Sequence, residues 1–128
     1  MSILADRESR LLIDGKLVTG SGGTFETVNP ATEEVLGVAA DADEADMGAA
    51  IGAARAAFDD TDWSTNTELR VRCLRQLREA LQANIEDLRE LTISEVGAPR
   101  MLTSGAQLEG PVDDLAFSAD TAESYQWR

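Results

Sequence analysis

The sequence predicts a small α+β fold in which β-hairpins are followed by three to four helices. Residues 11–40 contain four short runs of strand-forming residues separated by turn signals. From residue 41 onward, apolar residues recur at spacings of three and four, which is the helical period. We therefore expect an N-terminal tail over residues 1–10, hairpins within 11–40 and helices within 43–125.

The first hairpin is predicted over residues 11–18. Two apolar runs, 11–13 and 16–18, flank Asp14-Gly15. Glycine readily adopts the positive φ that a two-residue type I′ turn requires, so this pair is a strong hairpin signal.

A second hairpin is predicted farther along, between residues 24–28 and 35–39. The first of these runs ends at Asn29-Pro30, and proline lacks a backbone donor and biases the preceding residue away from helix. An isolated hairpin is only marginally stable in water, so we expect both hairpins to lie on other parts of the protein.

The first helix is predicted to begin after Asp43, whose side chain is a good N-cap. Acidic Glu44 and Asp46 follow in the first turn, where the helix dipole favours negative charge. One face then carries Met47, Ile51, Ala54 and Phe58. The surrounding side chains are small, so we expect this helix to pack closely against another backbone.

A loop over residues 59–63 should separate this helix from the next one. Thr65 and Glu68 have the spacing of a capping box, in which each side chain bonds the backbone N–H of the other residue. The helix that follows should bury the stripe formed by Leu74, Leu77 and Leu81.

Three further signals divide the C-terminal half. Asn84, with Asp87 three residues on, predicts a break, after which a helix should be buried through Leu88, Leu91 and Ile93. Gly97 followed by Pro99 is a stop signal. A last helical region is expected from about Met101 to Tyr125, with a break at Gly110-Pro111 because proline suits a first helical turn.

Charge and composition argue against two classes of binding partner. The 128 residues carry 24 acidic and 11 basic side chains, which gives a formal net charge of −13. This balance argues against binding to nucleic acid or to an anionic membrane, because both require basic patches. No apolar run approaches the length of a membrane span, and the first ten residues do not resemble a secretion signal. The single cysteine fits a reducing compartment, so we expect a cytoplasmic protein.

The residues that most catalytic sites need are absent or poorly placed. The chain has no histidine, which excludes Ser-His-Asp and Cys-His catalysis and any imidazole metal site. Cys73 is the sole thiol, and its place beside Leu74 and Leu77 indicates a packing role. A nucleophilic role would need a depressed thiol pKa, for which Arg70 and Arg72 are the available cations.

Two other patterns are better explained by structure than by ligands. Gly20, Gly22 and Gly23 lack the spacing and the following helix of a phosphate-binding loop, so they predict a connection between strands. The acidic run over residues 41–46 lacks the turn glycine and the distal glutamate of a calcium loop, and it is explained by a helix N-terminus.

The order of several short motifs resembles the N-terminal portion of the NAD(P)-dependent aldehyde dehydrogenase family. The motifs are, in order, IDGK, TFETVNPATEEVLG, AARAAFD, Trp63-Ser64, LRVRCLRQLREAL and VGAP. Each one is weak alone, but the ordered set is specific and covers about residues 11–127. Ala98 is a departure, since members of the family commonly have lysine at that position.

The resemblance implies a reaction and a wider fold. In that α/β fold a Rossmann-like cofactor domain and a catalytic domain accompany a small oligomerisation arm. A catalytic cysteine forms a thiohemiacetal with the aldehyde, hydride passes to NAD or NADP, and the acid leaves after hydrolysis of the thioester. No position among these 128 residues matches that cysteine, the general-base glutamate or the cofactor-phosphate contacts. We therefore expect the catalytic domain and most of the cofactor domain to lie beyond Arg128, and this chain alone to bind no cofactor.

The resemblance also implies a cation site. Members similar to betaine-aldehyde dehydrogenases hold a structural monovalent cation, K⁺ or Na⁺, through backbone oxygens near TVNP and a carboxylate two residues before a helix-ending glycine. The matching positions are Thr27, Val28 and Glu95. Oxygen ligands suit a hard cation, while the alternative is that Glu95 only caps or solvates a helix end.

Partners follow from the same comparison. A segment that packs on a neighbouring domain should expose apolar side chains, here Phe58, Trp63, Leu115, Phe117 and Trp127, and such patches usually mark interfaces. We expect these faces to meet the remainder of the enzyme, a homodimer or homotetramer when complete, or to cause self-association. The alternatives are a free-standing binding or regulatory module derived from such an enzyme, and an unrelated helical unit without hairpins.

Overall fold

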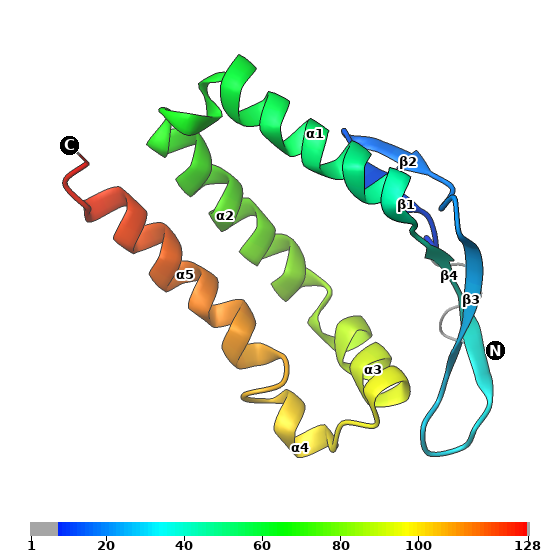
Figure 1. Ribbon diagram of the computed structural model, residues 1–128. Coiled ribbons are helices and arrows are strands. Elements are labelled where there is room, and N and C mark those ends of the chain that lie inside the picture. Colours follow the sequence, from blue (N-terminus) through cyan, green and yellow to red (C-terminus); the bar gives the residue numbers. More distant parts are fainter. Residues whose placement is uncertain (1–7, 128) are drawn as a thin grey trace. The chain divides into compact units, whose positions relative to one another are not determined.

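The computed structural model describes residues 8–127 and confirms the α+β fold class (Figure 1). The chain divides into two compact units, residues 1–62 and 63–128. In the first unit the elements are β1 (Leu11–Ile13), β2 (Lys16–Val18), β3 (Gly23–Val28), β4 (Val35–Asp41) and α1 (Glu44–Asp60). A 3₁₀ turn, η1 (Asp62–Ser64), connects the units. In the second unit they are α2 (Thr67–Ala83), α3 (Ile85–Val96), α4 (Arg100–Thr103) and α5 (Glu109–Ser124).

The first hairpin forms as the sequence predicts. Strands β1 and β2 pair antiparallel, with Leu11 opposite Val18 and Ile13 opposite Lys16. Asp14 has a φ of 54° and Gly15 a φ of 70°. Positive φ at both central residues is the signature of a type I′ turn, whose twist matches that of the flanking strands.

The second hairpin pairs β3 with β4 in a separate two-stranded sheet. Between the strands, Asn29 organises the turn: its side-chain oxygen accepts from the Ala31 N–H at 2.9 Å, and its backbone N–H donates to the Glu34 carbonyl, also at 2.9 Å. The connection before β3 requires glycine at residue 20, because a Cβ there would lie 2.2 Å from the Asp41 backbone oxygen. The glycine-rich segment is therefore a strand connection, as predicted.

Helix α1 starts with the predicted cap but does not pack as predicted. Asp43 and Asp46 form a reciprocal capping box, in which Asp43 accepts from the Asp46 N–H at 3.1 Å and Asp46 accepts from the Asp43 N–H at 3.2 Å. No side chain of α1 is buried, and its apolar face is open, with Met47 59% and Ile51 62% exposed. The expectation of close packing is wrong for the described chain, since small side chains permit a close neighbour without supplying one.

The second helix begins one residue later than the predicted capping box requires. Asn66 is the N-cap of α2 and accepts from the Leu69 N–H at 2.9 Å, so Thr65 does not cap this helix. The predicted loop over residues 59–63 is also shorter than expected, because α1 continues to Asp60 and η1 follows at Asp62.

The predicted helix ends in the second unit are mostly correct. Asn84 separates α2 from α3, and Gly97 ends α3 in the left-handed conformation, with a φ of 71° and its N–H bonded to the Ile93 carbonyl at 3.1 Å. The last break, however, falls over residues 104–108 rather than at Gly110-Pro111. Pro111 lies in the first turn of α5, where backbone N–H groups have no intrahelical acceptor, so the N–H that proline lacks costs no hydrogen bond.

The second unit is centred on the packing of α2 against α5, which run side by side and antiparallel (Figure 1). Its buried apolar side chains are small: Val71, Ala98, Val112 and Ala119. Leu77, predicted to be buried, is 49% exposed, and Leu74, Leu81, Leu88, Leu91 and Ile93 are only half-buried. Val71, rather than a leucine of the predicted stripe, is the buried residue of α2, and the periodicity of the helix does not identify it.

Over residues 8–127, none of the helices combines the length and the apolarity that crossing a bilayer requires.

Candidate functional site

Two of the predicted cation ligands lie at a distortion of the β3–β4 ribbon. Thr27 is opposite Gly37 and Val28 is opposite Val35, so the register shifts between the two residues. The Thr27 hydroxyl donates to the Gly37 carbonyl at 3.3 Å. The irregularity adds one residue, Leu36, on β4 opposite this pair and interrupts the regular ladder there.

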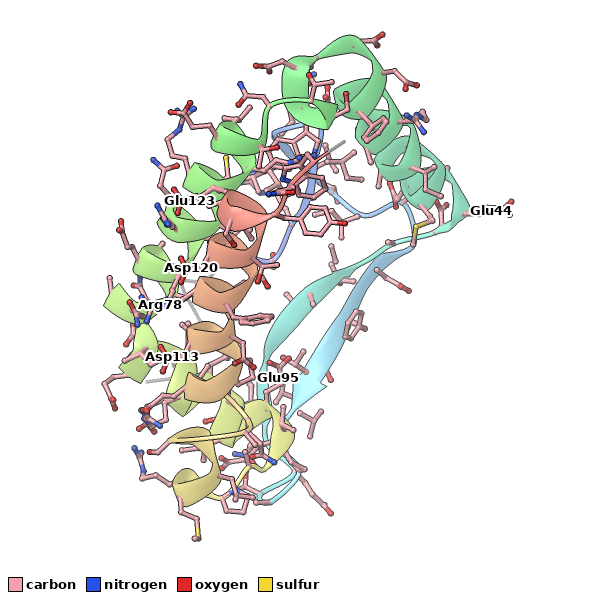
Figure 2. The ribbon with its side chains drawn as sticks, turned by 90° about the vertical axis from the view of Figure 1, so that its left-hand side faces the viewer. Glu44, Arg78, Glu95, Asp113, Asp120 and Glu123 are labelled. Carbon is pink, nitrogen blue, oxygen red and sulfur yellow. The ribbon has the colours of Figure 1, made fainter. Side chains whose placement is uncertain are left out.

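The third predicted ligand, Glu95, is exposed in the last turn of α3, two residues before Gly97 (Figure 2). It belongs to the second unit, whereas Thr27 and Val28 belong to the first. Within the described residues, no group of three or more acidic, histidine or cysteine side chains is arranged to hold a metal ion. The cation site therefore stays a prediction that depends on main-chain oxygens and one carboxylate.

The thiol at Cys73 is half-buried in α2 and forms no disulfide. The guanidinium of the neighbouring Arg70 donates to the Ser64 carbonyl at 3.2 Å and to the Thr67 hydroxyl at 3.0 Å. It also stacks over the Trp127 ring at 5.3 Å. Arg70 therefore holds the start of α2 against the end of the chain.

The connection between β2 and β3 is fastened to the start of α1 by one carboxylate. Asp46 accepts from the Ser21 backbone N–H at 2.7 Å and from the Ser21 hydroxyl at 3.1 Å. It also accepts from the Asp43 N–H at 3.2 Å. The Ser21 N–H, followed by the Asp43 N–H, lowers the pKa of Asp46 below its ordinary value of 3.8, because both bonds favour the charged carboxylate.

A buried arginine joins three segments of the second unit. Arg89 on α3 is 5% exposed and donates to the hydroxyls of Thr103 at 2.7 Å and Ser104 at 3.3 Å. It also forms ion pairs with Glu86 and with Glu109 at the start of α5. The bond to Glu109 and then the bond to Glu86 raise the pKa of Arg89 above its ordinary value. A buried charge needs such complete pairing to be tolerated.

Ion pairs also line the outer edge of the α2–α5 seam (Figure 2). Arg75 bonds Glu123 at 2.6 Å and Asp120 at 3.3 Å, and Arg78 bonds Asp113 at 2.9 Å. Beside them a groove of about 560 Å³ is lined by Val71, Arg72, Gln76 and Trp127, among others. Glu68, Glu79 and Glu123 also line the groove beside its two arginines, so the groove presents no concentrated positive charge for an anion.

Sequence reasoning missed the Arg89 and Asp46 contacts because their partners are distant in the chain. Glu109 lies 20 residues after Arg89, and Ser21 lies 25 residues before Asp46. The spacing of Glu86 and Arg89 was a usable local signal, since side chains three apart face each other on a helix. These contacts organise the fold, and they bring together neither a nucleophile with a base nor a set of metal ligands.

The comparison with known proteins identifies the origin of this fold. The sequence-based family model described as the aldehyde dehydrogenase family matches residues 17–128. The chain belongs to the aldehyde dehydrogenase family. It is 38% identical over 117 residues to aldehyde dehydrogenase 1 of Tanacetum cinerariifolium, an alignment that covers 90% of this chain and 23% of that protein. Betaine aldehyde dehydrogenase of Vibrio vulnificus is 35% identical over 115 residues, covering 88% of this chain and 22% of its own length.

Solved aldehyde dehydrogenases contain the same arrangement. The NAD⁺ complex of the Bacillus cereus enzyme superposes with a TM-score of 0.86 at 31% identity, covering 96% of this chain and 26% of that one. For the Mycobacterium tuberculosis enzyme complexed with NAD⁺, the TM-score is 0.84 at 30% identity, with 93% and 25% covered. The chain thus spans about a quarter of the length of these aldehyde dehydrogenases, and the resemblance to their N-terminal portion is confirmed.

Proposed function

We propose that this chain is the N-terminal segment of an aldehyde dehydrogenase that oxidises an aldehyde to a carboxylic acid with NAD⁺ or NADP⁺, and that the segment alone is inactive. The observation that carries the proposal is the superposition of 96% of the chain on a quarter of an NAD⁺-bound family member. No position of this chain matches the catalytic cysteine or the general-base glutamate that the family resemblance implies, which supports the second half of the proposal. The chemistry then depends on residues outside this chain, and hydride acceptance is supplied by the bound nicotinamide.

The segment's own contribution is structural in this proposal. Its large apolar side chains point outward, among them Phe117, which is 74% exposed, and Trp127, which is 58% exposed. Four of the five side chains predicted to be exposed are so, namely Phe58, Trp63, Phe117 and Trp127, while Leu115 is half-buried. These faces support packing on the rest of the enzyme, which we propose to be a cytoplasmic homodimer or homotetramer.

The proposal is tested with the complete coding sequence of the natural protein. Nicotinamide reduction is followed by absorbance, with NAD⁺ and NADP⁺ compared on a panel of aldehydes. We expect the complete protein to turn over at least one aldehyde and residues 1–128 alone to show neither turnover nor NAD⁺ binding. A complete protein that binds the nucleotide but reduces it with no aldehyde would overturn the assigned reaction.

A second experiment distinguishes the hypothesis of an enzyme segment from that of a free-standing module. The native transcript is sequenced across the codon for Arg128. A reading frame that continues into a cysteine-containing catalytic domain supports the proposal. A stop codon at that place would refute it and favour a binding or regulatory module derived from the family.

We further propose that Thr27, Val28 and Glu95 bind a structural K⁺ or Na⁺ in the complete enzyme. The register shift at Thr27 and Val28 supports main-chain ligation, and Glu95 offers an exposed carboxylate. Thermal melting is compared in potassium, sodium and choline chlorides at equal ionic strength. We expect K⁺ or Na⁺ to raise the melting temperature of the native enzyme, and Glu95→Gln to lose that rise.

The matched control for this experiment is Glu79→Gln. Glu79 is an exposed helical glutamate on α2, so its substitution removes the same charge from the same unit. It should leave the cation effect intact. Equal loss in both variants would mean that the net charge of the second unit, rather than a site at Glu95, causes the effect.

A further inference from the structure

We draw no further inference here: the strongest candidate, the aromatic surface patch of Phe117, Tyr125 and Trp127 at the C-terminal end of α5, is an unpartnered apolar face, and nothing in the structure shows what covers it.

Discussion

Gly97 ends α3 in a conformation that only glycine adopts without strain, so Gly97→Ala should destabilise the second unit. Its φ of 71° lies in the left-handed region, which costs a residue with a Cβ about 1–2 kcal/mol. Alanine also lowers the conformational entropy of the unfolded chain, which stabilises the folded state by about 0.4–1 kcal/mol. The net loss of unfolding free energy is therefore about 1 kcal/mol.

Gly105 provides a control in the same unit. It is not among the glycines with positive φ, and a Cβ added there would meet only the Leu102 carbonyl oxygen, at 3.9 Å. Gly105→Ala therefore gains the restriction of the unfolded chain without the strain, and it should stabilise by about 0.4–1 kcal/mol. The effect on the unfolded chain is common to both variants, so they should differ by the strain alone, about 1–2 kcal/mol, although the chemical change is identical.

Urea denaturation followed by tryptophan fluorescence measures this difference directly. Both tryptophans of the chain, Trp63 and Trp127, belong to the second unit. With a typical urea dependence of about 2 kcal/mol per M, the two midpoints should be separated by about 0.5–1 M. Gly97→Asn should recover part of the loss, because asparagine tolerates the left-handed region better than alanine.

Coincident midpoints for Gly97→Ala and Gly105→Ala would refute the reasoning, as would a greater loss in the Gly105 variant. Either result would mean that backbone strain at the end of α3 does not limit the stability of this unit. A change in the slope of the transition would invalidate the comparison of midpoints, so equal slopes are the internal check.

Three other outcomes are expected. Val112→Ala removes two methyl groups from a 6% exposed side chain and should lower the unfolding free energy in urea by about 2 kcal/mol. Val96→Ala, at a 68% exposed position, should lower it by under about 0.5 kcal/mol. Similar losses in the two variants would contradict the assigned core. Asp46→Asn should lower the unfolding midpoint at pH 7. Because the pKa of Asp46 is depressed in the folded chain, the difference between the variant and the native chain should disappear as the pH falls below 3.8. A difference that persists in acid would exclude the charged carboxylate as its cause. The isolated chain should self-associate in light-scattering measurements, because large apolar side chains are exposed. Phe117→Ser should weaken the self-association more than Ser118→Ala does. A monodisperse native chain would show that the exposed patch does not cause association.

Local signals predicted the elements whose cause is local. The turn at Asp14-Gly15, the cap at Asp43 and the stop at Gly97 all depend on residues within one turn, and all three are confirmed. The capping-box spacing predicts a start of α2 one residue too early, because Thr65 and Asn66 are adjacent and both are able to cap. Periodicity alone does not separate such neighbours, and only the bond from the Leu69 N–H to Asn66 decides between them.

Burial was predicted less well because it depends on contacts between segments. The leucine stripe of α2 was expected to be interior, yet Val71 is the buried residue of that helix and Leu77 is half-exposed. Arg89 is buried because Glu86 and Glu109 match its charge and the Thr103 hydroxyl accepts a hydrogen bond from it, which no hydrophobic pattern indicates. The candidate cation site stays a prediction, because two of its three ligands are main-chain oxygens that leave no side-chain signal.

The small side chains at the centre of the second unit have a consequence for how stability should be measured. Val71, Ala98, Val112 and Ala119 supply little apolar area, while much larger side chains remain in contact with water. A second copy of the chain that covers those side chains would bind the folded state and not the unfolded one, so mass action links folding to the expected self-association. The melting temperature of this chain should therefore rise with its concentration, and a single value measured at one concentration would not describe its stability.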